Sequence, residues 1–517
     1  MPLRLPVKKK LVSRSDRVKS VDLHTDQPWV LVAMYDGRVS VWDYEAQKNI
    51  KDIELCDVPL RCAKWVVRKQ WIVTAGDNLE ICVVNYNTYD VVKRVAAHSD
   101  YIRSLAVHPT HPWCLSASDD MTVKLWDWDK NWECLRTFEG HVHYVMRVVW
   151  NPKDTNTFCT ASLDKTIKVW NSQGSLLFTL EGHEKGVNCV EYYAGGDRPY
   201  LISGSDDKTA KVWDFQTREC VQTLQGHTAN VTDVSYHPKL PIIMTGSEDG
   251  SVRVYHNTTY RAETTFNNAM DRVWSINCIK GSHHVAIGQD EGTVVVKIGS
   301  DEAIVSMFQS KIIWSKQETI MTANVKTLTD EEMVDGEVLQ LQTKDMGVVA
   351  EIFPQMLKHQ PPAGRNFAVA GDDQLIVYST LAMRNKHFCT ASTFAWSTEG
   401  HLATFDRTKV KVSNASFQEI WSLNPPGMLD DLSGGQLLCM RTSSHADAHA
   451  LFYDWNKCVL IASIEIEALR VDWNDSGNKV AIVTKEALFI LQYNAELVEQ
   501  FLAAGGDPEG AGKIFYL

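Results

Sequence analysis

The feature that most constrains the fold of this chain is a short motif that returns every 42 to 44 residues. Its clear copies are VSVWD at 39–43, VKLWD at 123–127, IKVWN at 167–171 and AKVWD at 210–214, and its weaker copies are ICVVN at 81–85 and VRVY at 252–255. The alternating apolar residues of such a unit cannot be buried within that unit alone, so repeats of this kind pack against their neighbours. The period therefore predicts a series of small, similar sheets rather than one continuous core.

Two further markers recur at fixed distances from the aromatic residue of this motif. A histidine lies 28 to 30 residues before it in four units, at His98, His141, His183 and His227. An aspartate lies six residues before it in five units, at Asp36, Asp120, Asp164, Asp207 and Asp249. Together these markers are the signature of the WD40 repeat, a four-stranded antiparallel blade of a β-propeller. We interpret the His, Asp and Trp residues as a hydrogen-bonded structural network within each blade, and not as catalytic groups.

The repeats predict an all-β chain whose first domain, residues 1–300, is a seven-bladed WD40 β-propeller. The seventh blade is degenerate; it runs from about residue 270 to residue 297 and contains the sequence EGTVVV at 291–296. We expect the extended stretch 3–12 to complete this blade, because a closed ring leaves no free sheet edge.

The second half, residues 301–517, is less regular. Its strand ends, IVY at 376–378, VKV at 410–412, LFY at 451–453 and FIL at 489–491, recur every 34 to 41 residues. They predict a second, divergent propeller with turns such as NDSG at 474–477 and room for only four or five blades. After Asn494 as a helix cap, residues 495–504 predict a short helix with Leu497 and Phe501 on one face, followed by a loop at 505–510. We therefore expect the second propeller to be incomplete and the chain to be the front part of a longer protein.

Composition and charge exclude several classes of protein. Apolar residues make up 44% of the chain and charged residues 22%, as in a soluble globular protein, while the net charge of −12 argues against nucleic acid as the main partner. No apolar run reaches the roughly 18 residues that a membrane span needs, and Lys8, Lys9 and Lys10 are not followed by the apolar core of a signal peptide. The 12 cysteines include no Cys-x-x-Cys pair. The sequence thus predicts neither a zinc site, a disulfide framework nor a cofactor, and it fits a reducing cytosol.

Two positions in each blade are candidates for binding a partner, because they face the end of the propeller where loops gather. The first position, just before the structural aspartate of the inner turn, holds Tyr35, Asp77, Asp119, Leu163, Asp206, Glu248 and Asp290 in the seven blades. Five acids at one equivalent position would surround a central funnel and raise the negative potential there.

The second position is the start of the innermost strand, where the alignment of SDRVK at 15–19 with SDYIR at 99–103 sets the register. Blade by blade, the side chains on this face are Arg17 and Lys19, Pro59 and Arg61, Tyr101 and Arg103, Tyr144 and Met146, Gly186 and Asn188, Asn230 and Thr232, and Arg272 and Trp274. Cations thus gather on blades seven, one, two and three, and acids without cations lie on blades five and six. Tyr35, Tyr101 and Tyr144 lie between them, each with apolar walls and a polar tip.

Such a surface suits a ligand with an anion at one end and cations a short way along. A free peptide C-terminus with lysines upstream is a ligand of this kind. An extended chain covers about 3.3 to 3.6 Å per residue, so a lysine three residues from the end lies about 10 Å or more from the carboxylate. Arginine suits the carboxylate, because its planar fork can donate two parallel hydrogen bonds.

With these residues in view, the first half resembles the N-terminal propeller of the coatomer β-prime family of the COPI vesicle coat. The shared stretches are SDRVK at 15–19, NYNT at 85–88, AHSDYIR at 97–103 and EGHEKGVN at 181–188, with KDMG at 344–347, IFPQ at 352–355 and LAMRNK at 381–386 in the second half. The resemblance covers nearly the whole chain and is densest up to about residue 300.

The resemblance implies recognition of C-terminal dilysine signals on the cytosolic tails of membrane proteins, for retrieval from the Golgi to the endoplasmic reticulum. By position, it implies that Arg17, Lys19 and Arg61 hold the terminal carboxylate. It also implies that the lysines are cradled by Tyr35, Asp100, Tyr101, Asp119, Tyr144 and Asp206, with Arg103 and Arg272 beside them. Asp100 comes from the resemblance alone, whereas Asp77 and Glu248 come from the ring position alone.

The resemblance further implies other coatomer subunits as partners, especially the α subunit, through an α-solenoid that this sequence lacks. It implies a cytoplasmic protein that associates only peripherally with Golgi membranes and COPI-coated vesicles.

Two alternatives to a chain-end binding protein are an enzyme and a different WD40 adaptor. The neighbouring carboxylates Asp119–Asp120 and Asp206–Asp207 could suggest acid–base catalysis. One member of each pair belongs to the structural network, however, and the sequence has no phosphate-binding glycine loop, nucleophile motif or metal cluster. We therefore predict that the chain is not an enzyme.

A different adaptor could bind phosphopeptides through its cations or lysine-rich internal peptides through its acids. The acids would repel a multiply phosphorylated ligand. Only the pairing of acids with a cationic carboxylate pocket selects for a chain end.

Overall fold

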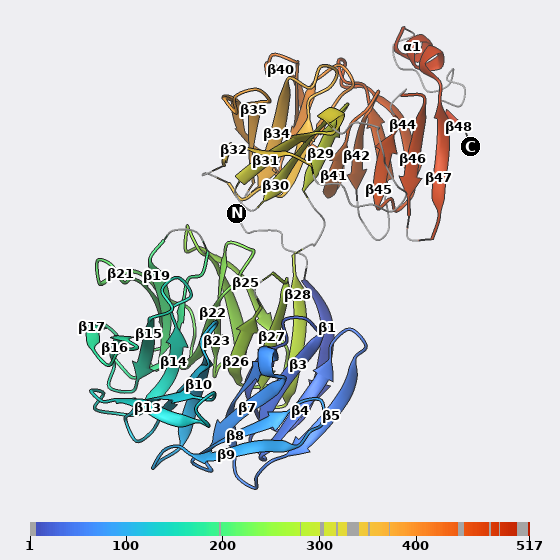
Figure 1. Ribbon diagram of the computed structural model, residues 1–517. Helices are drawn as coiled ribbons and strands as arrows, with labels where there is room; N and C mark the ends of the chain where they lie inside the picture. Colours follow the sequence, from blue (N-terminus) through green and yellow to red (C-terminus); the bar gives the residue numbers. More distant parts are fainter. Residues whose placement is uncertain are drawn as a thin grey trace. The chain divides into compact units, whose positions relative to one another are not determined.

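The computed structural model describes residues 7–195, 198–279, 281–299, 304–316, 319–327, 341–349, 352–371, 373–442, 449–474, 477–484, 486–503 and 515–516. The chain divides into two compact units, Pro2–Asp301 and Glu302–Leu517. In both units the strands form four-stranded sheets (Figure 1). The prediction of an all-β propeller chain is confirmed.

In the first unit, the described residues form seven four-stranded sheets, six of which are continuous in sequence. The first three are β2 (Val18–Leu23), β3 (Trp29–Met34), β4 (Arg38–Asp43) and β5 (Lys48–Glu54); β6 (Leu60–Val66), β7 (Trp71–Gly76), β8 (Glu80–Asn85) and β9 (Val91–Ala96); and β10 (Ile102–Val107), β11 (Trp113–Ser118), β12 (Val123–Asp127) and β13 (Glu133–Phe138). The next three are β14 (Val145–Trp150), β15 (Thr157–Ser162), β16 (Ile167–Asn171) and β17 (Leu176–Leu180); β18 (Val187–Tyr192), β19 (Tyr200–Ser205), β20 (Ala210–Asp214) and β21 (Glu219–Leu224); and β22 (Val231–Tyr236), β23 (Ile242–Ser247), β24 (Ser251–His256) and β25 (Ala262–Asn267). A short 3₁₀ turn, η1 (Val67–Lys69), separates β6 from β7.

The seventh sheet joins the two ends of this unit. It consists of β26 (Val273–Cys278), β27 (His284–Gln289), β28 (Gly292–Ile298) and the N-terminal strand β1 (Val7–Arg14), which pairs antiparallel with β28. Figure 1 shows β1, in blue, beside the yellow-green β28. A Cβ at Gly292 would lie 1.9 Å from the carbonyl oxygen of Ser13, so only glycine admits β1 this closely. The part of the predicted N-terminal stretch that the structure describes therefore completes this sheet, as expected.

The seven sheets are held together by apolar clusters shared between neighbours. Val145 and Phe158 pack with Leu115 of the preceding sheet, and Val18 packs with Val295 across the junction of the first and seventh sheets. The innermost strands, β2, β6, β10, β14, β18, β22 and β26, contact one another in a closed circuit. Each sheet packs between two neighbours, so the circuit holds the inner strands in fixed positions. The candidate site lies where these strands begin.

Every innermost strand carries a β-bulge near its start. Pairing with the second strand skips one residue in each sheet, namely Lys19, Arg61, Arg103, Met146, Asn188, Thr232 and Trp274. A bulge leaves its residue out of the ladder and re-aims the side chain. These seven residues form one equivalent set, called the bulge residues below.

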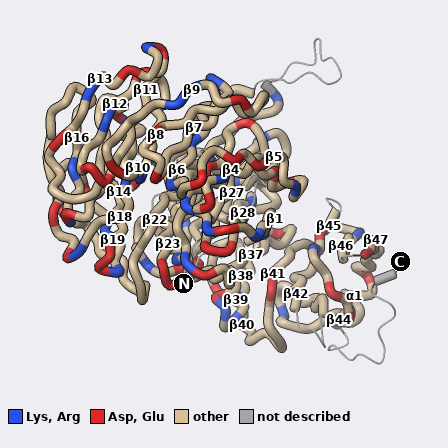
Figure 2. The backbone as a smooth tube through the Cα atoms, turned by 90° about the horizontal axis from the view of Figure 1, so that it is seen from below, with Lys and Arg blue, Asp and Glu red and all other residues tan. Residues whose placement is uncertain are grey.

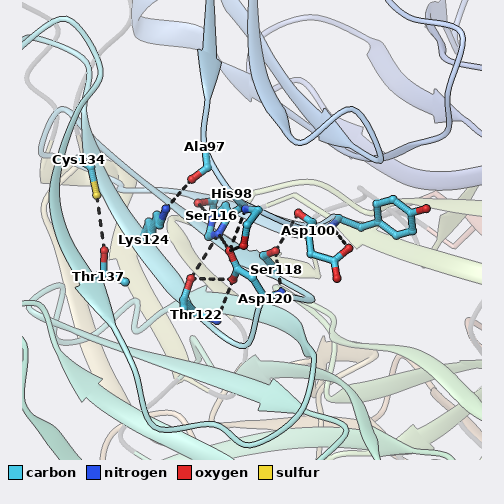
Figure 3. Close-up of polar contacts among 12 residues, drawn as sticks. Ala97, His98, Asp100, Ser116, Ser118, Asp120, Thr122, Lys124, Cys134 and Thr137 are labelled. Carbon is cyan, nitrogen blue, oxygen red and sulfur yellow. Dashed lines mark hydrogen bonds and ion pairs between the residues drawn. The ribbon is translucent and has the colours of Figure 1, made fainter.

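The predicted network of His, Asp and Trp is present, and Figure 3 shows its members His98, Asp120 and Ser116. In the third sheet, His98 Nδ1 lies 2.8 Å from Asp120 Oδ2, and His98 Nε2 lies 2.7 Å from Ser116 Oγ, which also accepts the indole N–H of Trp126 at 2.9 Å. The same network recurs as His141, Asp164, Thr160 and Trp170, and as His183, Asp207, Ser203 and Trp213. The hydroxyl member was not predicted, because Ser and Thr are too common in strands to stand out in a sequence.

The second unit contains five four-stranded sheets among its described residues. The first two are β29 (Val305–Phe308), β30 (Lys311–Lys316), β31 (Thr319–Asn324) and β32 (Thr343–Val348), with η2 (Val325–Thr327) before β32, and β33 (Met356–His359), β34 (Asn366–Gly371), β35 (Gln374–Ser379) and β36 (Asn385–Thr390). The others are β37 (Thr393–Trp396), β38 (Leu402–Phe405), β39 (Val410–Ser413) and β40 (Glu419–Leu423); β41 (Leu429–Ser433), β42 (Leu438–Thr442), β43 (His449–Tyr453) and β44 (Leu460–Glu465); and β45 (Arg470–Trp473), β46 (Lys479–Val483), β47 (Leu488–Tyr493) and β48 (Phe515–Tyr516). Consecutive sheets share apolar clusters, such as Phe367 with Ile313 and Phe452 with Val480.

Helix α1 (Ala495–Ala503) follows β47, and the Oδ1 of Asn494 accepts the backbone N–H of Leu497 at 3.2 Å, which confirms the predicted cap. Val498 and Phe501 are the buried residues of the helix, whereas Leu497 is only half-buried. Leu497 and Phe501 lie four residues apart in this helix and so on one face, as predicted, while Val498 is the second buried residue. Part of the turn predicted at 474–477 and all of the loop predicted at 505–510 lie outside the described residues. Within those residues, helical segments of sufficient length and apolarity to span a bilayer are absent.

Candidate functional site

The two sets of candidate positions in the sequence are joined in the structure by one repeated backbone contact. In each sheet of the first unit, the inner-turn residue donates its N–H to the carbonyl of the residue before the inner strand, at 2.8 to 3.1 Å. The seven pairs are Tyr35 with Arg17, Asp77 with Pro59, Asp119 with Tyr101, Leu163 with Tyr144, Asp206 with Gly186, Glu248 with Asn230, and Asp290 with Arg272. Corresponding side chains of different sheets therefore occupy equivalent places around the circuit.

All seven bulge residues line one cavity of about 190 Å³ at the middle of the circuit, called the central cavity below. Asp206 and Glu248 line it from the inner turns, and Ser20, Cys62 and Arg147 line it from the next position of their strands. Figure 2 shows acidic and basic segments close together around β6, β10 and β14. The bulges explain this convergence, because they turn one side chain of each sheet toward the centre.

A second hollow, of about 530 Å³, lies where the first and seventh sheets meet and is called the rim hollow below. It is lined by Asp16, Arg17, Tyr35, Asp36, Asp271, Arg272 and Asp290. Of the residues singled out in the sequence, Lys19, Arg61, Arg103 and Asp206 line the central cavity, and Arg17, Tyr35 and Arg272 line the rim hollow. Asp100, Tyr101, Asp119 and Tyr144 line neither.

Three cations surround the ring of Tyr35. Arg17 Cζ lies 5.2 Å from the ring centroid, Lys19 Nζ lies 5.9 Å from it and Arg61 Cζ lies 6.0 Å from it. We call Arg17, Lys19 and Arg61 the cation cluster. Arg61 also lies 5.5 Å from the ring of Tyr101, so cations and tyrosine rings alternate along this side of the circuit.

Lys19 is the most perturbed member of the cation cluster. Its Nζ lies 3.0 Å from the centroid of the Trp274 ring. Burial, followed by the charges of Arg61 and Arg17, lowers the pKa of Lys19 to about 7. An anion bound here would offset the mutual repulsion of these cations and favour the protonated form of Lys19. The cation cluster is therefore suited to a small anionic group.

Three of the five acids at the inner-turn position are held by arginines of the protein itself. Asp119 accepts two hydrogen bonds from Arg103, at 2.7 and 2.5 Å, and Asp77 accepts two from Arg61, of which that from Nη2 measures 2.9 Å. These pairs neutralise the carboxylates with the planar geometry that arginine favours. The sequence predicted the acids but not their partners.

The third of these acids, Asp290, bridges two arginines. Its Oδ1 lies 2.6 Å from Arg17 Nε and its Oδ2 lies 2.7 Å from Arg272 Nε, while the indole N–H of Trp274 donates to Oδ1 at 2.8 Å. Burial raises the pKa of Asp290, but the hydrogen bonds from Trp274 and Arg272 outweigh it and hold the pKa below its ordinary value. Asp290 therefore remains ionised and fixes both arginines at the rim hollow.

Asp206 and Glu248 differ from the other inner-turn acids. In the part of the chain that the structure describes, neither forms a salt bridge, and Asp206 Oδ1 accepts only a neutral hydrogen bond from Asn188 Nδ2, at 2.8 Å. Both carboxylates line the central cavity. These two acids on the fifth and sixth sheets can therefore receive a cationic group of a ligand.

Asp100 and Arg147 are special cases. Asp100 is half-buried, its Oδ1 accepts the N–H of Tyr101 at 2.7 Å, and its carbonyl accepts the hydroxyl of Ser118 (Figure 3). Arg147, which the sequence did not single out, lies 3.6 Å from Asp233, and the charge of that aspartate raises the pKa of the guanidinium. A signal existed for Arg147, since it directly follows Met146, which the register of the inner strands had placed among the candidates.

The carboxylate pairs that could have suggested catalysis are divided between two tasks. Asp120 and Asp207 bond to His98 and His183 in the structural network, as predicted, whereas Asp119 and Asp206 face the arginine and asparagine bulge residues of their sheets. Among the described residues, no group of His, Cys, Asp and Glu side chains is arranged to hold a metal ion.

Comparisons with known proteins agree with this architecture. The family model described as "COPA/B second beta-propeller" matches residues 317–515. The model described as "WD domain, G-beta repeat" matches residues 7–43, 90–127, 132–171, 174–214 and 218–256.

Three similar proteins are coatomer subunits. Coatomer subunit beta' of Rattus norvegicus is 50% identical over 513 residues, which cover 99% of this chain and 56% of that protein. Coatomer subunit beta'-1 of Arabidopsis thaliana is 50% identical over 522 residues, which cover 100% of this chain and 56% of that protein. Coatomer subunit beta' of Homo sapiens is 51% identical over 513 residues, with coverages of 99% and 56%. The chain thus spans little more than half the length of these relatives.

Proposed function

The chain belongs to the family of coatomer subunit beta' homologues, and from that premise we propose that it acts in the COPI coat by binding C-terminal dilysine signals. The ligands are the cytosolic tails of membrane proteins that return from the Golgi to the endoplasmic reticulum. The first unit binds the signal, and the second unit belongs to the scaffold of the subunit.

The observation that carries this proposal is the polarity of the central cavity. Lys19 and Arg61 of the cation cluster line it from the first two sheets, and Asp206 and Glu248 line it from the fifth and sixth. A peptide that ends in a free carboxylate and carries lysines just upstream matches both ends at once. A ligand with only one kind of charge would leave the other end without a partner.

The terminal carboxylate lies against Arg17, Lys19 and Arg61 in this proposal. Arg61 uses Nε and Nη2 on Asp77, which leaves Nη1 for the ligand, and Lys19 gains an anion that offsets the charges of Arg61 and Arg17. Hydrogen bonds from the charged Arg61 and Lys19 to a carboxylate are stronger than hydrogen bonds between neutral groups.

The lysines lie against Asp206 and Glu248, with the exposed rings of Tyr35, Tyr101 and Tyr144 along the way. Asp100 adds a carboxylate beside Tyr101. Asp119, although the resemblance implies contact with a lysine, acts by fixing Arg103 in this proposal, because both of its oxygens are bonded to that guanidinium. Arg272 supports the site through Asp290.

Binding is expected to be reversible, with a dissociation constant on the order of 1 μM, or about −8 kcal/mol. Charged hydrogen bonds in a partly buried site contribute about 1.5 to 3 kcal/mol each, and exposed ion pairs only about 0.2 to 1 kcal/mol. A cargo receptor of a transport coat must also release its ligand, and this affinity permits it.

The same family membership supports a wider proposal about partners and place. The protein associates with other coatomer subunits, especially the α subunit, and lies in the cytoplasm with peripheral attachment to Golgi membranes and COPI-coated vesicles. The relatives are nearly twice as long as this chain, so the proposal about partners concerns the whole protein.

Calorimetric titration of the full chain tests the function. The ligand is a short peptide ending in Lys-Lys-x-x with a free carboxylate, and the comparison ligands are its C-terminal amide and a version with both lysines replaced by alanine. We expect micromolar binding of the first peptide and loss of about tenfold or more in affinity for each comparison ligand. Equal binding of the amide would instead support a receptor for lysine-rich internal peptides that uses Asp206 and Glu248 alone.

A further inference from the structure

We infer that Trp274, a bulge residue of β26, is a positioning residue for the chain-end pocket: its ring face carries the ammonium of Lys19, and its indole N–H fixes Asp290 between two arginines. Nothing in the sequence assigned a role to this tryptophan beyond its register. The predicted effect on ligand affinity rests on the proposed function. The contacts of Trp274 with Lys19 and Asp290 can be tested without a ligand.

The geometry of Trp274 links two sheets. Its ring lies under Lys19 Nζ at 3.0 Å from the centroid, and Arg272 Cζ and Arg17 Cζ lie 5.3 and 5.9 Å from the same ring. Its Nε1 donates to Asp290 Oδ1 at 2.8 Å. One side chain of the seventh sheet therefore lies beside both Lys19 and Arg17 and also holds Asp290, the partner of Arg17.

The ring of Trp274 lies beside an ammonium that has several cationic neighbours. Lys19 is near the charges of Arg17, just before its own strand, of Arg61 on β6, and of Arg272 and Asp290 beside the strands of the seventh sheet. It also lies 5.9 Å from the ring of Tyr35. A carboxylate in place of the tryptophan would neutralise Lys19 and compete with the ligand. The negative face of an aromatic ring attracts an ammonium without supplying a full counter-charge, so the ammonium stays available to an anion.

The indole N–H performs the second task. Asp290 has two oxygens and three donors, namely Arg17, Arg272 and Trp274. With the indole hydrogen bond in place, the carboxylate plane is fixed, and the two guanidinium groups are held on either side of it. Loss of this bond would leave Arg17 free to turn away from the pocket.

Two substitutions separate these tasks. Trp274→Phe keeps a ring face for Lys19 and removes only the donor to Asp290, whereas Trp274→Leu removes both. Trp113→Leu is the matched control, because Trp113 begins β11 at the end opposite the inner-turn residue Asp119 and lines neither the central cavity nor the rim hollow.

The first readout needs no ligand. Nuclear magnetic resonance of the full chain with labelled lysine side chains follows the titration of Lys19, whose signal is assigned by its absence in Lys19→Arg. We expect a midpoint near 7 in the wild type, in Trp113→Leu and in Trp274→Phe. In Trp274→Leu, the ammonium loses the attraction of the ring face and keeps its cationic neighbours, so the midpoint should fall below the wild-type value.

The second readout is the affinity for the Lys-Lys-x-x peptide with a free carboxylate. We expect Trp274→Phe to lower it about fivefold through the lost bond to Asp290, Trp274→Leu to lower it further, and Trp113→Leu to leave it within about twofold. If the wild type does not distinguish the free carboxylate from its amide, the proposed function fails, while the titration of Lys19 still tests the role of Trp274.

Unchanged Lys19 titration in a folded Trp274→Leu protein, with unchanged affinity in Trp274→Phe, would overturn the inference. If Trp274→Leu does not fold, Trp274→Met supplies the same loss of the ring face with a larger apolar side chain. A purely structural tryptophan would change stability in all of these variants and leave the Lys19 midpoint in place.

Discussion

Arg103 and Asp119 are joined by two parallel hydrogen bonds, at 2.7 and 2.5 Å, on a carboxylate whose side chain is only 3% exposed. Asp206 occupies the same position two sheets further on, but its bulge residue is Asn188, a neutral donor. The same inner-turn aspartate is therefore an internal counter-ion in one sheet and an unpaired acid in another. Replacing the aspartate with asparagine should therefore affect mainly stability at Asp119 and mainly ligand binding at Asp206.

The first prediction compares Asp119→Asn with Asp206→Asn. Asp119→Asn leaves Arg103 without its counter-ion in a largely buried place, so the free energy of unfolding should fall by about 2 to 3 kcal/mol. Asp206→Asn removes no internal ion pair, so its free energy of unfolding should change by less than about 0.5 kcal/mol. Urea denaturation, combined with hydrogen exchange of the β10 and β18 amides, measures both.

The same pair of variants should show the reverse order in binding. Asp206→Asn should weaken the Lys-Lys-x-x peptide about tenfold, because a lysine loses its charged acceptor. Similar losses of stability in the two variants would contradict the distinction drawn here.

The second prediction concerns Glu248, which the resemblance did not include. Glu248→Gln should lower the affinity for the dilysine peptide about threefold to tenfold, and it should reduce the dependence of that affinity on salt. The peptide with both lysines replaced by alanine is the control, since its weak binding should be insensitive to this substitution. A wild-type affinity in Glu248→Gln at low salt would remove Glu248 from the site.

The third prediction follows from the depressed pKa of Lys19. With a value of about 7 instead of 10.5, Lys19 is charged below pH 7 and increasingly neutral above it. A carboxylate binds the charged form, so above pH 7 the site must take up a proton with the ligand. Affinity for the free-carboxylate peptide should therefore fall as pH rises above about 7, by at most about tenfold per unit.

Titration calorimetry in buffers of different ionisation heat measures this proton uptake directly. Lys19→Met should bind the peptide more weakly at pH 6 than the wild type does. Its affinity should also change less as the pH rises above about 7. An affinity that increases with pH in the wild type would be incompatible with a carboxylate beside Lys19.

The fourth prediction concerns the structural network. Burial raises the pKa values of Asp120, Asp164 and Asp207, but hydrogen bonds from the paired histidine and a neighbouring threonine outweigh it and hold each pKa below its ordinary 3.8. The stability that these carboxylates contribute is complete above 3.8 and is lost as pH falls further. The free energy of unfolding should therefore decrease steeply below about pH 4.

Asp164→Ala is the test of this acid dependence. It should lower stability by about 1 to 3 kcal/mol at pH 7 and make the remaining loss at acid pH smaller than in the wild type. An unchanged acid dependence would show that the unfolding in acid comes from other carboxylates.

The sequence predicted the parts of this molecule that repeat. The period and the His and Asp markers identified the blades, and the alignment of residues 15–19 with 99–103 identified the inner-strand positions. The seven backbone bonds between inner turns and inner strands show that both positions are equivalent from sheet to sheet. These features are local and recur, so a pattern in one chain reveals them.

The arrangements that set the charge of the site could not be predicted, because they depend on geometry between strands. The bulge that turns Arg61 and Trp274 toward the centre is a property of pairing with the next strand, not of composition. The pairing of Arg103 with Asp119 and the bridging position of Asp290 depend on which side chains the turns bring together. The rotation of helix α1 that buries Val498 instead of Leu497 likewise comes from the sheet against which it packs.

The central claim, that a peptide carboxylate lies against Arg61, is tested most directly by a double-mutant cycle. Wild type and Arg61→Met are each titrated with the Lys-Lys-x-x peptide as free acid and as amide. We predict that amidation weakens binding about tenfold or more in the wild type and less than about twofold in Arg61→Met, a coupling of roughly 1 kcal/mol or more. Equal losses on amidation in both proteins would mean that Arg61 does not contact the chain end, and the proposed polarity of the site would be wrong.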